Sequence, residues 1–429
     1  MDSAVDSTTF INPAEVISLP ETVNYSVLKN ILTHQRLTLV TDIREDYSFL
    51  NLKRAIKTYN KHVSKLSLSK TFNFYTDVIP HIAKWATDNE QSKCFQPLQA
   101  GKPGKVTYTI SQARHILANA FFLNTTSIKT RRIIRKGGYE TFGYGNIDLT
   151  DLYENVNRIG QERLLCLLSY FHQSIEEQSN ERVITIERYG TTVTIPHWST
   201  QDMIIHSSIV NIFTDRMENV QDANAFVDFA NKDIHIHCII PCCTQEEILF
   251  SCCPEAFLSM LICETLMDNE VVLIRGAKRF VDYDGYGSSF RFNGIYNNNS
   301  SNCQDILVMD ACFENQFTRD MIERDLGKAF RAFSSQTGKI VTGNWGCGAF
   351  GGNFIHKFLQ QVCAATVLQG QVTLEYSVYG QEKLADTLKT LIDTLNEKKK
   401  TVKEVYNMMI EYTKDKTEFE HYVKHWLNK

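Results

Sequence analysis

Residues 339–359 read KIVTGNWGCGAFGGNFIHKFL, and this stretch changes character twice. β-branched residues come first, five glycines then fall within residues 343–352, and apolar residues at three-to-four spacing follow Asn353. This order predicts a strand, a glycine-rich loop and a helix that is capped by Asn353. Glycines let the backbone come close to a ligand, and the N–H groups at a helix start attract anions. We therefore expect a phosphate-bearing ligand at this loop, with a tight structural turn as the alternative.

Two familiar nucleotide loops fit this stretch poorly. The substring GCGAFG satisfies the dinucleotide pattern G-x-G-x-x-G, but it lies late in the chain. The acidic residue expected near the end of the next strand has only Glu382 as a poor candidate. A Walker loop is excluded because no Lys-Ser or Lys-Thr pair follows the glycines.

The pattern of the chain changes near residue 180. Before it, stretches such as 45–66 repeat apolar residues at helical spacing, so residues 1–180 are predicted to form a mainly helical accessory domain. After it, short runs rich in β-branched or aromatic residues alternate with helical segments. These runs are 181–189, 224–240, 269–277, 304–311, 338–344 and 371–380. Residues 181–429 are therefore predicted to form an α/β domain with a mixed sheet flanked by helices.

The bulk composition narrows the functional classes. The chain has 429 residues and a formal net charge of −4, so a phosphate-rich ligand needs a local site and no direct DNA binding is expected. The N-terminus has no basic and apolar leader pattern, and no apolar run reaches membrane length. The twelve cysteines are most simply free thiols. We expect an intracellular protein, cytoplasmic or nuclear, that is not bound to a membrane.

Residues 235–250, HIHCIIPCCTQEEILF, allow more than one interpretation. Thr244 and Glu247 fit a capping box, in which both side chains close the first turn of a helix. Alternatively, Glu246 or Glu247 is a general acid; adjacent helical residues diverge by about 100°, so the two cannot flank one bond as a typical glycosidase pair does. The spacing leaves both interpretations open.

The same stretch contains residue types that can bind a metal. His235 and His237 would share one side of a predicted strand, with cysteines 238, 242 and 243 nearby. The spacing matches no familiar zinc pattern, and buried histidine and free cysteine on a core strand is the ordinary explanation. No metal and no cofactor are therefore expected.

Four motifs together resemble the poly(ADP-ribose) glycohydrolase family. They are GNWGCGAFGG at 343–352, VDFANK at 227–232, QEE at 245–247 and DYDGY at 282–286. The stretches SQARHILANAFF, LLCLLSYF and FYTDVIPHIA support them, so the similarity covers most of the chain from about residue 70. The resemblance implies a macrodomain-like α/β core with a helical accessory domain. It also implies hydrolysis of the ribose–ribose O-glycosidic bond of poly(ADP-ribose), releasing ADP-ribose without a metal.

The resemblance also implies roles for individual residues. Glu247 resembles the catalytic acid that protonates the leaving ribose hydroxyl, and Glu246 looks like the neighbour that holds ribose hydroxyls. Asn231 would orient the ribose, Tyr286 would close over the ligand, and Glu218 is similar in position to the residue that reads adenine. The loop residues Gly346, Cys347, Gly348, Ala349 and Phe350 would wrap the diphosphate, with Phe350 stacking near the distal ribose. Asn344 would support this loop, and Gln245 is a further implied substrate-binding residue. The implied partners are poly(ADP-ribose) and ADP-ribosylated proteins.

One segment departs from the family signature. The family has Gly-Gly-Gly, a short loop and then Gln-Glu-Glu, whereas this chain has His235-Ile236-His237 in place of the glycines. A glycine that needs positive φ is not simply replaced, since such strain costs about 1–3 kcal/mol for each residue. Two hypotheses follow: a working glycohydrolase with a rebuilt loop, or a relative that binds ADP-ribose polymer or serves in an assembly without turnover.

Overall fold

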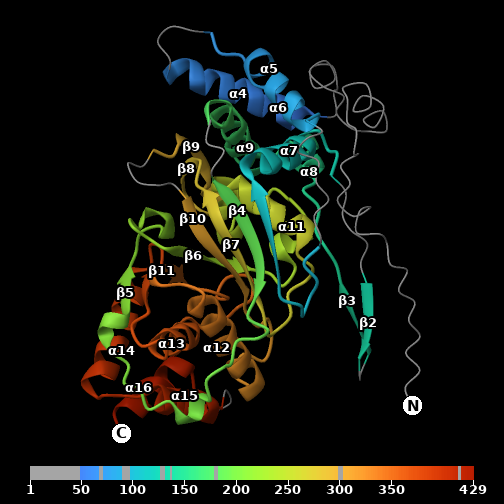
Figure 1. Cartoon of the computed structure of the whole chain (residues 1–429). Helices are drawn as coiled ribbons and strands as arrows, with labels where there is room; N and C mark the ends of the chain where they lie inside the picture. Colours follow the sequence, from blue (N-terminus) through green and yellow to red (C-terminus); the bar gives the residue numbers. More distant parts are fainter. Residues whose placement is uncertain are drawn as a thin grey trace, which may run out of the picture.

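An eight-stranded mixed sheet forms the centre of the computed structural model (Figure 1). The strand order is β1-β4-β7-β10-β6-β11-β12-β5. The first four strands pair antiparallel, and the pairs from β10 through β6, β11 and β12 to β5 are parallel. The strands are β1 (Gly104–Thr109), β4 (Val183–Tyr189), β5 (Val210–Phe213), β6 (Ala225–Ala230), β7 (Val271–Lys278), β10 (Cys303–Asp310), β11 (Gly338–Gly343) and β12 (Val372–Ser377). The predicted mixed sheet is confirmed.

The structure describes residues 49–66, 71–88, 97–125, 131–135, 138–177, 182–297, 303–413 and 417–429. Residues 1–48 of the predicted accessory domain lie outside this description. Two further two-stranded sheets are described: β2 (Arg131–Arg135) with β3 (Gly138–Phe142), and β8 (Val281–Asp284) with β9 (Arg291–Ile295).

Helices gather at the two ends of the molecule, as Figure 1 shows. One group is α4 (Leu50–Leu66), α5 (Phe74–Asp77), α6 (Ile79–Ala86), α7 (Ile110–Phe121), α8 (Thr150–Glu154) and α9 (Arg158–Glu176). The other is α12 (Arg319–Ser334), α13 (Phe354–Thr366), α14 (Glu382–Glu397), α15 (Val402–Glu411) and α16 (Phe419–Leu427). Between them in the sequence lie α10 (Gln245–Cys252) and α11 (Leu258–Ile262). None of the described helices combines the length and apolarity needed to cross a bilayer.

Strand β7 shows how the two faces of the sheet are covered. Its side chains alternate, so Val272 and Ile274 join one hydrophobic cluster while Val271 and Leu273 join the other. The first cluster contains residues of α4, α7 and α9, and the second contains residues of α12 to α16. The sheet is therefore buried on both faces, which explains the nearly continuous apolar sequence of β7.

The N-terminal region differs from the expectation in one respect. Strand β1 lies within it and pairs with β4 along the edge of the central sheet. The first hydrophobic cluster also runs from Phe49 to Val308 without a break at residue 180. The division at residue 180 thus stays a prediction, and the structure shows that residues on both sides of it share one core.

Candidate functional site

The glycine loop is built as the sequence predicts. Strand β11 ends at Gly343, α13 begins at Phe354, and Asn353 Oδ1 accepts a hydrogen bond from His356 N at 3.0 Å. Gly346 has φ of +71°, and a Cβ there would lie 2.5 Å from Ala311 Cβ. Side chains are therefore excluded on the inner side of the loop, and its bare backbone is held in place.

A buried ion pair lies beneath this loop. The Lys357 ammonium pairs with Asp325 with both side chains fully buried, and a Cβ at Gly352 would lie 3.1 Å from Lys357 Cε. Asp325 also accepts a hydrogen bond from Cys312 N at 3.1 Å, and Lys357 Nζ lies 5.1 Å from the Trp345 ring centroid. One ion pair thus joins α12, α13 and the end of β10 under the loop.

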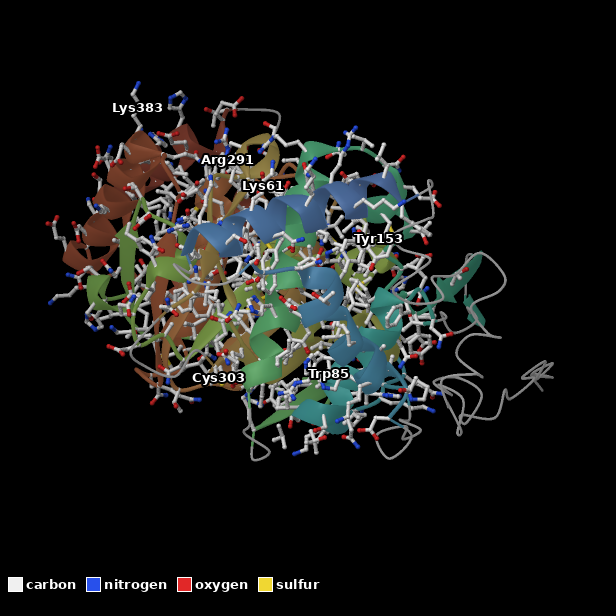
Figure 2. The ribbon with its side chains drawn as sticks, turned by 90° about the horizontal axis from the view of Figure 1, so that it is seen from above. Lys61, Trp85, Tyr153, Arg291, Cys303 and Lys383 are labelled. Carbon is white, nitrogen blue, oxygen red and sulfur yellow. The ribbon has the colours of Figure 1, made fainter. Side chains whose placement is uncertain are left out.

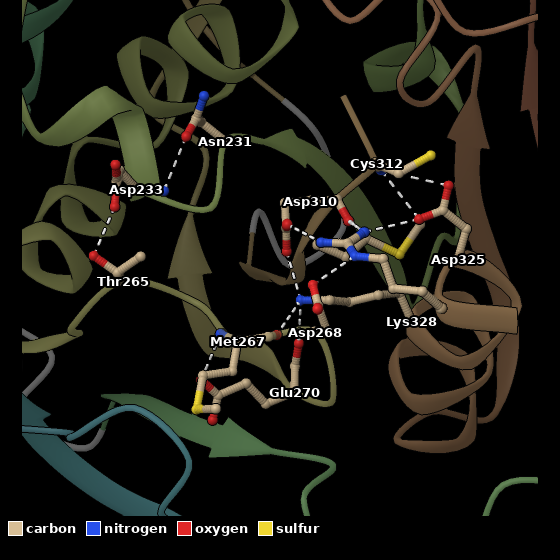
Figure 3. A network of polar contacts seen from close by, with 12 residues as sticks. Asn231, Asp233, Thr265, Met267, Asp268, Glu270, Asp310, Cys312, Asp325 and Lys328 are labelled. Atoms are coloured by element: carbon tan, nitrogen blue, oxygen red, sulfur yellow. Dashed lines mark hydrogen bonds and ion pairs between the residues drawn. The ribbon is translucent and has the colours of Figure 1, made fainter. Parts of the chain in front are cut away.

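A second ionic group extends this layer, as Figure 3 shows. Lys328 Nζ lies 2.5 Å from Asp310 Oδ1 and donates to the carbonyls of Met267 and Glu270 at 2.6 and 2.7 Å. Arg324 joins the two groups because it binds both Asp310 and Asp325. The glycine loop therefore rests on a fixed, fully paired ionic layer.

A cavity of about 480 Å³ opens in front of the glycine loop. It is lined by nine of the residues that the sequence analysis proposed: Glu218, Gln245, Tyr286, Asn344, Gly346, Cys347, Gly348, Ala349 and Phe350. Glu246, Glu247 and Asn231 are not among its lining residues. The structure thus brings most of the predicted binding residues together, and the two glutamates, which are both buried, do not line the cavity.

Two tyrosines from different elements face each other at the cavity. Tyr286 lies in the turn between β8 and β9, and Tyr379 follows β12. Their ring centroids are 6.0 Å apart, and the side chains are 45% and 42% exposed. Sequence reasoning missed Tyr379; the signal was its place just after a predicted parallel strand, where ligands of α/β sheets bind.

Glu218 sits in a closed hydrogen-bonded group at another part of the cavity. Its carboxylate accepts a hydrogen bond from the Tyr283 hydroxyl at 2.6 Å, and its carbonyl accepts one from Arg279 Nη1 at 2.7 Å. The Arg216 guanidinium lies 4.9 Å from the Tyr283 ring centroid. Arg216 and Tyr283 were also missed: Tyr283 lies in the DYDGY motif, where only Tyr286 was given a role, and no quoted motif contains Arg216.

Glu247 forms the capping interaction that its spacing allowed. Its Oε2 accepts a hydrogen bond from Thr244 N at 2.8 Å and another from the Thr244 hydroxyl. Burial alone would raise the pKa of Glu247, but His235, the Thr244 hydroxyl and Arg163 together lower it below the ordinary value. Glu247 is therefore ionised near neutral pH in this geometry.

Glu246 is in the opposite electrostatic state. Its Oε1 accepts a hydrogen bond from His235 N at 2.7 Å, and burial followed by the nearby charge of Asp228 raises its pKa well above the ordinary value. The Asp228 carboxyl is fully buried and, among the described residues, has no hydrogen-bond partner. Burial and the charge of Glu247 raise the pKa of Asp228 as well. The group therefore contains protonated and ionised carboxyls side by side, and Asp228 is a member that sequence reasoning missed.

The segment after β6 corrects a prediction. The strand expected over 224–240 ends at Ala230, and residues 234–237 form a tight turn. His235, Ile236 and His237 have φ of 54°, 49° and 56°, which is the left-handed region. The alternation HIH imitated a strand, but these residues retain a backbone that favours glycine.

The metal interpretation assumed that His235 and His237 lie on one side of a strand, and no strand forms at these residues. His235 Nδ1 donates to the Cys238 carbonyl at 2.8 Å, and His235 Nε2 accepts from Arg163 Nη2 at 2.9 Å. Both ring nitrogens are thus engaged. The side chains in the described part of the chain contain no cluster of three or more metal-ligating residues.

The side chain of Asn231 forms its hydrogen bond within its own loop. Its Oδ1 accepts a hydrogen bond from Asp233 N at 3.0 Å, and Asp233 in turn accepts one from the Thr265 hydroxyl at 2.6 Å (Figure 3). Its implied role toward the ribose stays a prediction.

Comparison with known families bears directly on this arrangement. The description "Poly (ADP-ribose) glycohydrolase (PARG), helical domain" matches residues 66–188. The description "Poly (ADP-ribose) glycohydrolase (PARG), Macro domain fold" matches residues 195–386. Together the two matches span well over half of the chain. The chain belongs to the poly(ADP-ribose) glycohydrolase family. The macrodomain fold and the helical N-terminal region are thereby confirmed.

Individual relatives within the poly(ADP-ribose) glycohydrolase family are similar over part of their length. Poly(ADP-ribose) glycohydrolase 1 of Caenorhabditis elegans is 32% identical over 223 residues, which are 46% of this chain and 28% of that protein. Poly(ADP-ribose) glycohydrolase 1 of Arabidopsis thaliana is 26% identical over 347 residues, which are 61% of this chain and 62% of that protein. The chain thus spans less than two thirds of the length of these curated relatives.

A solved poly(ADP-ribose) glycohydrolase of Deinococcus radiodurans in complex with ADP-ribose is 15% identical to the chain. The similarity covers 47% of this chain and 100% of that chain, with a TM-score of 0.29. A similarity of this size carries no argument about the site.

Proposed function

We propose that the chain binds the terminal ADP-ribose unit of poly(ADP-ribose) in the 480 Å³ cavity and hydrolyses its ribose–ribose bond. The observation that carries this proposal is the cavity lining. Backbone of the glycine loop, the Tyr286 ring and Gln245 at the start of α10 all meet in one space. Cavities of this size accommodate ligands as large as a nucleotide sugar.

Each part of the cavity suits one part of the ligand. The bare backbone from Gly346 to Ala349 suits a diphosphate, since N–H groups at a helix start attract anions. The Glu218 region offers a carboxylate to the N–H groups of a base. The distal ribose then points toward α10 and the two glutamates, and free polymer or ADP-ribosylated proteins are the partners.

Hydrolysis needs a proton at the leaving oxygen and negative charge beside an oxocarbenium-like transition state. In the proposed reaction Glu247 donates the proton to the leaving ribose oxygen as the glycosidic bond breaks, and Glu246 holds ribose hydroxyls. A water molecule then forms the new bond to the anomeric carbon and returns its proton to Glu247. A proton is available locally, because Glu246 and Asp228 both have raised pKa values. Before it acts, Glu247 must leave Thr244 and take up a proton.

A second candidate function is binding of the polymer without turnover. It is favoured by the state of Glu247, whose carboxylate caps its own helix, is ionised and does not line the cavity. In that case the glycine loop, Tyr286 and Glu218 still capture ADP-ribose, and bond cleavage is absent.

Digestion of purified poly(ADP-ribose) by the wild type and by Glu247→Gln separates the two candidates. A working enzyme releases ADP-ribose, and the variant loses about 10²–10⁴-fold in rate because a general acid is removed. Equal background release by both proteins, together with ADP-ribose binding by both, would instead assign the second function. Tyr286→Phe is the matched control, since it keeps the ring that covers the cavity.

A further inference from the structure

Helix α4 carries an exposed basic face. Arg54, Lys57, Lys61 and Lys65 lie on its solvent side at three- and four-residue intervals and are all exposed. The helix contains no Asp or Glu. Within the described residues none of these four side chains forms an ion pair with an acidic group. A basic face on a chain of net charge −4 is a local feature that the bulk composition hides.

The opposite side of α4 holds this face in a fixed position. Leu52, Ile56 and Tyr59 are fully or almost fully buried and belong to the first hydrophobic cluster. The Tyr59 hydroxyl lies 3.0 Å from His172 Nδ1 on α9. The four basic side chains therefore point outward from a rigidly packed helix, and they extend over about 16 Å at 1.5 Å for each residue.

The basic face connects to the turn that carries Tyr286. Gln161 Nε2 of α9 lies 3.5 Å from Thr58 Oγ1, between the basic residues of α4. One turn earlier on α9, the exposed Arg158 donates to the Phe290 carbonyl at 3.1 Å and also to the Ser288 carbonyl. Arg158 thus adds a positive charge between α4 and the cavity. Its one ion pair among the described residues is with Glu162, at 3.8 Å.

Strand β9 adds a further charge to the same side. The rings of His62 and Phe292 are 5.2 Å apart, which places β9 against the C-terminal half of α4. Figure 2 shows Lys61 and Arg291 near one another on the face seen from above. We call Arg54, Lys57, Lys61, Lys65, Arg158 and Arg291 the basic band.

The basic band reaches the cavity at the glutamate end. Gly287 N, next to Tyr286, donates to the Cys243 carbonyl at 2.8 Å, and Cys243 lies just before Thr244, the N-cap of α10. The turn with Tyr286 therefore borders both the band and the Gln245–Glu247 segment. A polymer whose terminal unit fills the cavity would leave at this end, because its scissile bond lies there.

We propose that the basic band binds the diphosphates of the polymer units that follow the unit in the cavity. This proposal rests on the proposed function, because it requires a terminal unit in that cavity. Each ADP-ribose unit carries a diphosphate, so the polymer is a flexible polyanion that cationic side chains attract without base recognition. Poly(ADP-ribose) is favoured over nucleic acid because Arg158 of the band binds the Ser288 carbonyl, in the turn whose Tyr286 lines the cavity where the proposed function places one ADP-ribose unit.

The test compares two triple variants. Lys57→Gln/Lys61→Gln/Lys65→Gln removes three charges from the band, and Lys389→Gln/Lys398→Gln/Lys399→Gln removes three exposed charges at α14, at the other end of the molecule (Figure 1). Fluorescence anisotropy measures the affinity of each for labelled long poly(ADP-ribose) and for single-stranded RNA of matched charge. Calorimetry measures the affinity of each for ADP-ribose alone.

The band variant is expected to bind ADP-ribose like the wild type and polymer more weakly. The plot of log binding constant against log salt concentration has a negative slope, and three lost phosphate contacts make it less steep by about 2. Between about 50 and 200 mM salt the wild type therefore loses about 20-fold more affinity than the variant. The α14 variant should match the wild type.

Equal polymer affinity and equal salt slope in the two variants would overturn the proposal. So would RNA binding by the band as tight as polymer binding, since the face would then serve nucleic acid. A wild type that does not bind ADP-ribose would instead contradict the proposed function, and this outcome is read from a separate titration.

Discussion

Arg163 Nη2 of α9 lies 2.9 Å from Nε2 of His235, the first of the three residues that stand where the family has glycines. The same guanidinium donates to the Ile240 carbonyl at 2.6 Å, and His235 is completely buried between Phe250 and Phe257. The imidazole therefore acts as an anchor for a left-handed backbone. The helical region and the glutamate loop are joined through one side-chain pair.

Replacing Arg163 should destabilise the protein. Arg163→Leu leaves the part-buried Ile240 carbonyl and the buried His235 Nε2 without a donor, and we expect a loss of about 2–4 kcal/mol in the free energy of unfolding. Urea denaturation measures it. Arg163→Lys, which keeps one donor, should lose less. Equal stability of the leucine variant and the wild type would show that the pair holds nothing in place.

Ile236 should be strained at its φ of 49°. Its side chain is 40% exposed, so little packing is lost on truncation. We expect Ile236→Gly to be more stable than Ile236→Ala by about 1 kcal/mol, because only glycine is relaxed at positive φ. The alanine variant is the control for the lost side chain. An alanine variant as stable as the glycine variant would argue against strain at this residue.

Stability should depend on pH through His235. Burial, followed by the charge of Arg163, lowers the pKa of His235 to about 4. The unfolded chain takes up a proton below about 6.5 and the native state does not until near 4, so stability falls as pH drops between these values, by roughly 3 kcal/mol at most.

His235→Asn should flatten this slope, since asparagine tolerates the left-handed region and does not titrate. Urea unfolding at several pH values between 7 and 4 measures it, and His421→Asn on the exposed side of α16 is the matched control. Asp228 and Glu246 have raised pKa values and act in the opposite direction in all variants. A parallel pH profile for wild type and His235→Asn would refute the assignment.

The ion pair beneath the glycine loop should matter for stability and for binding. Asp325→Asn leaves the Lys357 ammonium buried without its counter-charge, and we expect a loss of about 3–5 kcal/mol in unfolding free energy. ADP-ribose affinity, measured by calorimetry, should fall with it. Removal of the exposed Glu420–Lys424 pair by Glu420→Gln should cost less than about 1 kcal/mol. Similar losses in both variants would contradict a special role for the buried pair.

The sequence predicted the parts of this fold that local pattern controls. The strand, glycine loop and helix at 338–366, the Asn353 cap and the Thr244–Glu247 capping interaction all follow from residue types at short spacing. Eight of the nine predicted lining residues of the cavity came from the quoted motifs, and Glu218 came from its position in the chain.

Other features depend on contacts that are distant in the sequence. Tyr379 and Tyr283 enter the cavity from strands whose ends become neighbours only after folding. The alternation His235-Ile236-His237 resembles a strand in the sequence. The segment forms a turn instead, because Arg163, 72 residues earlier, supplies the partner that stabilises it. Asp228 lies in the VDFANK motif, but no role was predicted for it; only the structure shows a buried carboxyl beside Glu246 that has no hydrogen-bond partner among the described residues.

If the cavity before the glycine loop holds ADP-ribose, Gly348 is the residue at which a substitution tests this most directly. It lines the cavity, and a Cβ at this position meets nothing within 4 Å, so Gly348→Val should fold normally and fill the space that the ligand needs. Calorimetric titration with ADP-ribose should give binding heat for the wild type, reduced affinity for Gly348→Ala and no binding for Gly348→Val at an unchanged melting temperature. No heat with the wild type, or equal affinity in the wild type and Gly348→Val, would contradict the claim.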